Sequence, residues 1–307
     1  MPGDDYFRDT TASAVVGVPG RFELDLSEAW QVAVVPQGGI VAALAARTIA
    51  REIDHPDQRL RTITATFAAP VRSGPVAVDV NVIRRGRSMS HGMAMVHNSG
   101  ATAGVVVTAA FGSTRPGFEF TDVVCPDAPP PEECPSFRDP WPEDIPEYAR
   151  DRQPQEPAPF WTRIEGRAIG GHAPWETWKP TTSERLYWHR FDDPPIAADG
   201  RLDPFAVLVL ADAMPGAVAE RMGEYGDWFG PSVDLTVHVF GRLSAGWVLM
   251  RNRARLAGDG YASLEMELWD PVDRRLVAYA TQQMVFAFAG EPPPPELRRP
   301  RDQREPN

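Results

Sequence analysis

Two long apolar segments divide the chain into two similar halves. The first covers residues 38–46 and is followed by several segments in which apolar and polar residues alternate. The second covers residues 203–211, about 165 to 170 positions later, and the same kind of alternation follows it. This pattern predicts two copies of one unit, each with a helix and several strands. The interface between two such copies is a favoured place for a small-molecule site.

The alternation and the turn residues give each half the order β-α-β-β-β-β. In the first half, Gln37-Gly38-Gly39 opens a helix that runs to about Ile53. Its strands are predicted at 20–32, 60–67, 76–85, 88–97 and 101–112. In the second half, Asp203 is the predicted N-cap of the helix and Pro204 its first residue. Its strands are predicted at 182–191, 232–240, 247–256, 261–269 and 276–288.

These elements favour an α+β fold. A helix that is apolar nearly all round must be buried, and an antiparallel sheet that wraps it gives the hotdog arrangement. We therefore expect a double hotdog, with two antiparallel sheets that each wrap round one long helix. A parallel α/β fold is disfavoured, because each half has only one long helix beside four or five strands.

The composition along the chain predicts four regions. Residues 1–115 form the N-terminal hotdog and residues 161–290 the C-terminal hotdog. Between them, residues 116–160 are a proline-rich linker whose aromatic residues predict that it packs against the protein, and residues 291–307 are a disordered tail. The linker carries both cysteines, Cys125 and Cys134. We expect free thiols, with a loop-closing disulfide as the alternative, and no metal site.

The charge and the length limit the function classes. The chain has 307 residues and a formal net charge of −11, which argues against nucleic acid and anionic membranes as broad partners. No stretch approaches the ~20 apolar residues of a membrane span, and the N-terminus does not resemble a signal peptide. The sequence therefore predicts a cytoplasmic protein without a membrane span.

Three polar residues are candidates for a functional site. Two of them interrupt apolar faces, and the third lies on a polar strand face. Asp212 falls on the apolar row of the second helix, where a carboxylate is costly unless it is paired or functional. The alternative is that Pro215 kinks the helix and Asp212 only serves the freed backbone groups. Gln282 lies on an otherwise apolar strand face, where it could simply satisfy backbone groups. Ser232 shares a polar strand face with Asp234 and His238.

That polar strand face has two further interpretations. It could face solvent or an interface, with no part in catalysis. Asp234 and His238 could also form an acid/base pair of their own, although a surface ion pair is the simpler interpretation.

The chain resembles the type II acyl-CoA thioesterases, which are double-hotdog hydrolases, and more closely their actinobacterial thioesterase-like branch. The resemblance covers most of the chain outside the linker and the tail. It rests on the order and spacing of several motifs, namely residues 37–39, 67–71, 84–88, 210–213, 231–234, 269–270 and 276–282. It implies a catalytic trio of Asp212, Ser232 and Gln282. The family more often has Thr at the position of Ser232, and often has His where this chain has Leu235.

The trio fits thioester hydrolysis, which needs a directed water and a base to take its proton. Asp212 would be the base, while Ser232 and Gln282 hold the water and the carboxylate. The start of the first helix, Gly38 and Gly39, has free N–H groups, and we expect the Gly39 N–H to stabilise the oxyanion. The resemblance also makes Arg87 a candidate for binding coenzyme A phosphates, although ordinary solvated arginine is the simpler interpretation.

The sequence predicts one active site, because the alignment of the two halves places Arg47 opposite Asp212. The favoured function is hydrolysis of fatty acyl-CoA without a cofactor. The alternative is a double hotdog that binds acyl-CoA or lipid without catalysis. A dehydratase or hydratase is disfavoured, because neither helix carries the His that this chemistry usually needs. The family implies a homodimer or a higher homo-oligomer.

Overall fold

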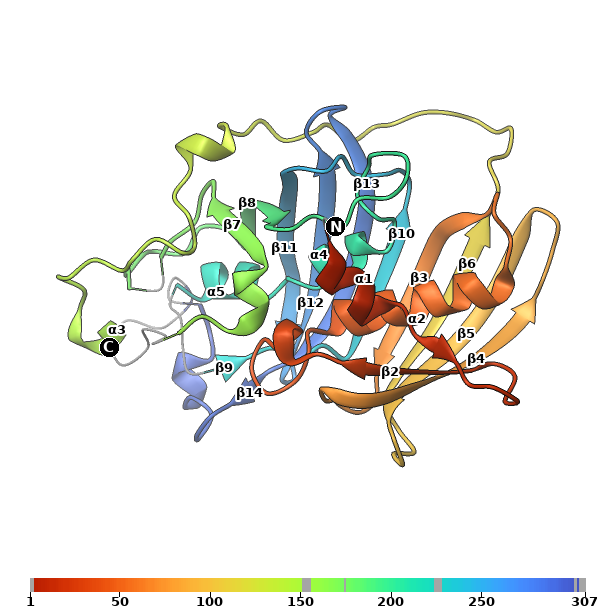
Figure 1. Cartoon of the computed structure of the whole chain (residues 1–307). Helices are drawn as coiled ribbons and strands as arrows, with labels where there is room; N and C mark the ends of the chain where they lie inside the picture. The colour runs from red at the N-terminus through yellow and green to blue at the C-terminus, as the bar shows by residue number, and fades with distance from the viewer. Residues whose placement is uncertain (1–2, 151–155, 174, 224–227, 301–302, 304–307) are drawn as a thin grey trace.

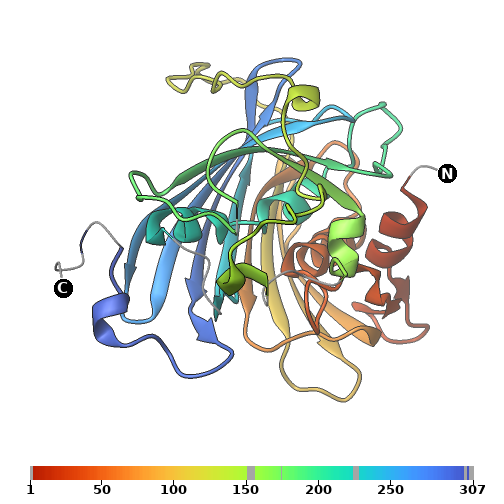
Figure 2. The ribbon, with the colours of Figure 1, turned by 90° about the vertical axis from the view of Figure 1, so that its left-hand side faces the viewer.

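One antiparallel sheet runs through both halves of the protein. The computed structural model describes residues 3–150, 156–173, 175–223, 228–300 and 303. Within them, twelve strands follow the order β1-β2-β4-β5-β6-β3-β10-β13-β12-β11-β8-β7. Figure 2 shows the strands of the two halves side by side in one curved layer.

The expectation of two separate sheets was therefore wrong. Strand β3 (Arg59–Phe67) pairs with strand β10 (Asp234–Val239), and this pairing joins the halves. At the seam the hydroxyls of Thr64 and Thr236 lie 3.0 Å apart. The pairing removes two edge strands that would otherwise expose unpaired backbone groups.

The first half agrees closely with the predicted elements. Helix α2 (Gly38–Ile53) begins after Gln37, as predicted, and ends at Asp54, which adopts a left-handed conformation (φ 52°). Its apolar side chains pack against the strands behind it, and Gly92 allows a close approach, because a Cβ there would lie 2.3 Å from Ile49. The strands are β1 (Ser13–Ala14), β2 (Arg21–Leu26), β3, β4 (Gly74–Arg84), β5 (Met89–Asn98) and β6 (Val105–Gly112).

The second half lacks the single long helix that the sequence predicted. Helix α4 (Ala206–Ala211) has six residues, and α5 (Gly216–Met222) follows after a break. Pro215 explains the break, because its ring clashes with the carbonyl four residues earlier and disfavours helical geometry at the residue before it. Asp203 accepts the N–H of Phe205, so it caps the turn that leads into α4. The strands are β7 (Ile164–Ala168), β8 (Glu184–Phe191), β9 (Trp228–Phe229), β10, β11 (Val248–Gly258), β12 (Tyr261–Asp270), β13 (Arg275–Val285) and β14 (Ala287–Phe288).

The helices α1 (Asp4–Thr10), α2 and α4 lie on one face of the sheet (Figure 1). The sequence did not predict α1, β7 or α5. In this layer the N-terminus of α2 approaches the C-terminus of α4, although these segments are far apart in the chain. The contact between the two helix ends is where the halves meet.

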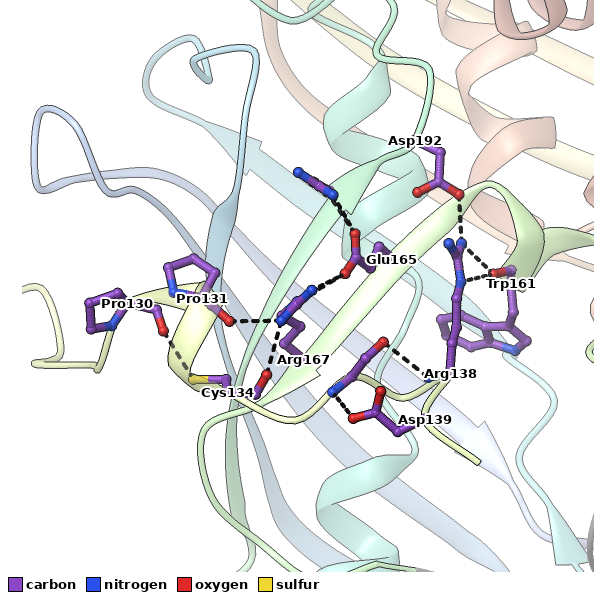
Figure 3. Close-up of polar contacts among 11 residues, drawn as sticks. Pro130, Pro131, Cys134, Arg138, Asp139, Trp161, Glu165, Arg167 and Asp192 are labelled. Carbon is purple, nitrogen blue, oxygen red and sulfur yellow. Dashed lines mark hydrogen bonds and ion pairs between the residues drawn. The ribbon is translucent and has the colours of Figure 1, made fainter. Parts of the chain in front are cut away.

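The linker crosses from β6 to the far side of the second half and is fixed there (Figure 1). It contains the short helix α3 (Glu147–Arg150) and the 3₁₀ turns η2 (Pro131–Glu133) and η3 (Pro159–Thr162). Figure 3 shows how it binds β7: Arg167 donates to the carbonyls of Pro131 and Cys134, at 3.2 and 3.1 Å.

Both cysteines of the linker are buried as free thiols. They pack in a small cluster with Trp188, Leu249 and Trp269. Burial raises the pKa of both thiols, so they are protonated near neutral pH. The prediction of free thiols is confirmed, and both thiols pack where the linker meets the second half.

The C-terminal tail adds little to the core, and its 3₁₀ turn has no buried residues. The predicted tail contains the 3₁₀ turn η4 (Pro295–Leu297), while residues 301–302 and 304–307 lie outside the described residues. Among the residues that the structure describes, no helix is both long and apolar enough to cross a bilayer.

Candidate active site

Asp212 lies at the point where the two helix ends meet. It is the first residue after α4, and its backbone (φ −88°, ψ 53°) has left the helical conformation. Its Oδ2 accepts the backbone N–H of Gly39, the second residue of α2, at 2.9 Å. The carboxylate of one half is therefore bound at the positive end of the helix of the other half.

Ser232 and Gln282 hold the other oxygen of this carboxylate. The Ser232 Oγ donates to Asp212 Oδ1 over 3.1 Å, and the Gln282 Nε2 donates to the same oxygen over 2.5 Å. Gln282 Nε2 also lies 2.7 Å from Ser232 Oγ. The three residues that the sequence singled out therefore form one hydrogen-bonded group.

Strand pairing places Ser232 next to Gln282. Ser232 forms a bridge with Met284 of β13, and the N–H of Val233 donates to Gln283 at 2.7 Å. Because alternate residues of a strand share a face, Gln282 and Met284 point to the same side of the sheet. The short segment before β10 thus delivers the hydroxyl to the inner face, and the alternative of a solvent-facing Ser232 was wrong.

The electrostatics of the site suit a base that works near neutral pH. Burial raises the pKa of Asp212 to about 6, against the opposing effect of the hydrogen bonds from Gln282, Ser232, Gly39 and Gly38. Desolvation outweighs the donors because they are all neutral. A pKa close to the working pH favours a group that must both take and return a proton.

Both glycines at the start of α2 are needed for the close approach of Asp212 and α4. A Cβ at Gly39 would lie 2.3 Å from the carbonyl oxygen of Leu208, inside α4. A Cβ at Gly38 would lie 2.5 Å from the ring of Phe67 and 2.8 Å from Asp212 Oδ2. Any side chain at either position would separate the helix ends and move the carboxylate.

Two residues near Asp212 were missed as site residues by the sequence reasoning. The amide of Gln37 donates to the carbonyl of Asp212 at 2.8 Å, and the hydroxyl of Tyr187 donates to the carbonyl of Ala213 at 2.9 Å. The position of Gln37, directly before a predicted helix, was a signal for a cap but not for a contact with the other half. Tyr187 gave no signal, because its local sequence does not show that its hydroxyl would reach the segment after α4.

The structure does not bring Arg87 to this group. Its hairpin lies at the C-terminal end of α2, where Arg85 donates to the carbonyls of Glu52 and Ile53. Asp212 lies at the opposite end of the helix, and sixteen helical residues span about 24 Å. The pair Asp234 and His238 is also not formed: Asp234 accepts from the Gln283 N–H, and His238 contacts Thr62.

Arg47 occupies the position that mirrors Asp212. From α2 it reaches the start of α4, where its Nη2 donates to Asp203 at 2.8 Å. The same Asp203 oxygen accepts the Tyr6 hydroxyl at 3.1 Å. The second helix contact thus carries an ion pair between Arg47 of α2 and Asp203 at the start of α4. In the described part of the chain, no cluster of His, Cys, Asp and Glu has the make-up of a metal site.

Both halves of the chain match models of a known protein family. The family model of the acyl-CoA thioesterase N-terminal domain matches residues 26–113, and that of the C-terminal domain matches residues 131–286. No curated protein shows a significant sequence match to the chain.

Several solved structures have a similar fold. One is a protein of unknown function with a hot dog fold from Alicyclobacillus acidocaldarius, with 24% identity and a TM-score of 0.73, over 93% of this chain and 98% of that chain. Another is an acyl-CoA thioesterase II of Mycobacterium marinum, with 18% identity and a TM-score of 0.68, over 93% and 99%. A TesB protein of Mycobacterium avium subspecies paratuberculosis has 18% identity and a TM-score of 0.70, over 94% and 100%. At these identities the similarity establishes the hot dog fold.

Proposed function

Because this chain belongs to the acyl-CoA thioesterase family, we propose that it hydrolyses the thioester of fatty acyl-CoA, with Asp212 as the general base. The observation that carries this proposal is the carboxylate of Asp212 held by Ser232, Gln282 and Gly39. Family membership supports the substrate class, and the geometry supports the assignment of roles.

The attacking water needs an acceptor position on a carboxylate that already accepts several hydrogen bonds. A carboxylate has about four acceptor positions. The hydroxyl of Ser232, the amide of Gln282 and the N–H of Gly39 occupy three of them, and the N–H of Gly38 also lowers the pKa of the carboxylate. The Ser232 hydroxyl is the donor that can leave most easily, since it only has to rotate about one side-chain bond. We propose that the water replaces Ser232 on Oδ1 and that Ser232 then bonds to the water.

The reaction then follows in two steps. The water oxygen bonds to the thioester carbon while its proton passes to Asp212. The tetrahedral intermediate breaks its carbon–sulfur bond, and the proton on Asp212 passes to the leaving thiolate. The products are a carboxylic acid and free coenzyme A. A base with a pKa of about 6 can serve both steps.

We assign Gly39 a different role from the one that the sequence predicted. Its N–H donates to Asp212, so it can stabilise an oxyanion only if the carboxylate turns away. We propose that this N–H holds Asp212 in place. Arg87 stays a sequence-based candidate for the coenzyme A phosphates, and a role there would require the ligand to extend along α2.

The test is thiol release measured with DTNB (Ellman's reagent), across acyl-CoAs from acetyl-CoA to palmitoyl-CoA. Hydrolysis by the wild type that is abolished in Asp212→Asn supports the proposal. The alternative is a double hotdog that binds acyl-CoA without hydrolysing it. Binding of the same ligands by calorimetry, with no thiol release from the wild type, would establish that alternative.

A further inference from the structure

The side chain of Gln37 links the two helix ends that meet at the active site. Its Oε1 accepts the N–H of Ile40 at 3.1 Å and so caps the start of α2. Its Nε2 donates to the carbonyl of Val209 at 2.9 Å and to the carbonyl of Asp212 at 2.8 Å. One buried amide thus satisfies groups at the beginning of one helix and at the end of the other.

These contacts match what helix ends require. The first N–H groups and the last carbonyls of a helix have no partner within the helix. A carboxamide has a donor end and an acceptor end, so it can serve both sides at once. Gln37 is buried and lies opposite the carbonyl of Asp212, while Gly39 binds the carboxylate of the same residue. Asp212 is therefore held from the first half at its backbone and at its side chain.

We propose that Gln37 is a positioning residue, which fixes Asp212 against the start of α2 through its two donor contacts to the end of α4. This inference rests on the proposed function of Asp212. Asp212 follows a helix of only six residues and has already left helical geometry. Its N–H donates to the carbonyl of Leu208 in α4 at 3.3 Å, while its carbonyl is bound by Gln37 of the other half. A misplacement of about 1 Å at a catalytic group is enough to cost about 100-fold in rate.

Two variants separate this role from simple capping of α2. Gln37→Glu has the same shape and keeps the acceptor for Ile40, and a negative charge is favourable at a helix start. It loses both donors to α4. Gln37→Met keeps the length of the side chain and loses both the acceptor and the donors. If Gln37 only caps α2, Gln37→Glu keeps the wild-type kcat at a pH where Asp212 is deprotonated in both proteins.

Asn252→Asp is the matched control. The Asn252 amide is buried, accepts the N–H of Ala217 near the start of α5 and donates to the carbonyl of Glu265. It makes the same kind of helix contact without bonding to Asp212. The control therefore measures how much stability is lost when a buried amide is replaced by an acid, without a change at Asp212.

The kinetic readout is kcat and KM at a temperature well below the unfolding midpoint of every variant. We expect kcat to fall about 100-fold in both Gln37 variants, with KM within about threefold of the wild type. Asn252→Asp should keep kcat within about threefold. Wild-type kcat in Gln37→Glu, or an equal loss in Asn252→Asp at equal stability, would overturn the proposal.

A second readout does not depend on hydrolysis. Carbon-13 NMR of labelled aspartate carboxyls follows Asp212, whose signal is the one that disappears in Asp212→Asn. We expect its titration midpoint to move upward in Gln37→Met, which adds no charge, because a displaced carboxylate loses the hydrogen bond from the Gly39 N–H, and to stay unchanged in Asn252→Asp. An unchanged midpoint in Gln37→Met would contradict the proposal. Absence of hydrolysis in the wild type, with a moved midpoint in Gln37→Met, would refute the proposed function and leave the positioning role in place.

Discussion

Replacing Asp212 by Asn tests the catalytic role and the electrostatics of the site together. The substitution keeps the size of the side chain and removes the base. We expect hydrolysis of acyl-CoA to fall by about 100-fold to 10,000-fold, which is the usual contribution of a positioned general base. We also expect the variant to be more stable than the wild type at neutral pH, because the wild type must bury a charge at this position.

The size of the stability effect follows from the pKa. An aspartate in an unfolded chain titrates near about 3.9, whereas burial raises the pKa of Asp212 to about 6. The unfolded chain therefore loses this proton first, and the wild type loses stability as the pH rises from about 4 to about 6. The full penalty above pH 6 is about 3 kcal/mol. This is an upper value, because the residue is partly exposed and water screens the charge.

The assay is thermal unfolding of the wild type and the variant across pH. Between pH 5 and 7.5 the difference in their free energies of unfolding should grow by about 1.4 kcal/mol in favour of Asp212→Asn. With an unfolding entropy of about 2.1 cal/mol/K for each of 307 residues, this corresponds to about 2 °C in the difference between their midpoints. The lost hydrogen bonds lower the stability of the variant by a similar amount at every pH, so they do not change the slope.

Asp234→Asn is the control. Asp234 accepts a backbone N–H from Gln283 and has no bond to the trio. Its replacement should leave hydrolysis within about threefold of the wild type. The reasoning is refuted if the midpoint difference for Asp212→Asn stays constant with pH, or if the variant hydrolyses acyl-CoA at the wild-type rate.

Four further predictions follow from single contacts. Ser232→Thr should keep kcat within about threefold and Ser232→Ala should lower it at least tenfold, because only the hydroxyl is needed; equal rates in a thiol-release assay would contradict this. His189 is buried, neither of its ring nitrogens has a hydrogen-bond partner, and burial lowers its pKa to about 3. The wild type therefore loses stability as the pH falls from about 7.5 to about 5. Relative to it, the free energy of unfolding of His189→Phe should rise by about 2 kcal/mol over this range in denaturant titrations. A gain that does not depend on pH would show that the imidazole takes up its proton in the folded protein as it does in the unfolded chain. Arg47→Ala should lower the free energy of unfolding by about 3 kcal/mol, since it breaks a buried pair with Asp203, and kcat of the folded enzyme should change little; a loss of kcat at full stability would point to a second catalytic role. Arg87→Ala should leave KM for acyl-CoA within about twofold, because Arg87 lies at the far end of α2, and a large rise in KM would restore the sequence-based assignment.

Helix α2 and most of the strands could be predicted from the sequence, because these elements depend on local signals. The segment Gln37-Gly38-Gly39 marks the start of α2, whose end was predicted near Ile53, and alternation marks the strands that have one buried face. The trio was found because the resemblance to a family carried Asp212, Ser232 and Gln282 over by position. Their mutual distances were not accessible, since the residues are up to 70 positions apart.

Predictions from the sequence were wrong where long-range contacts override the local pattern. The apolar run around Leu210 indicates a long helix, but Pro215 breaks it, and Asp212 becomes the C-cap residue of the short helix α4. The Gly39 N–H looked free because the sequence cannot show that a carboxylate from the other half binds it. The burial of His189 beneath the linker gave no signal either, because a lone histidine on a strand is more often exposed or bonded.

By itself the sequence determined most of the elements and the duplication of the unit, because hydrophobic periodicity and helix caps act over a few residues, and its resemblance to a family identified the three polar residues. Only the tertiary structure decided that β3 and β10 join the halves in one sheet, and that Gln37 and Gly39 of one half hold Asp212 of the other. The physical reason is that such contacts depend on the approach of two helix ends. That approach is set by the packing of the whole chain and not by any segment alone.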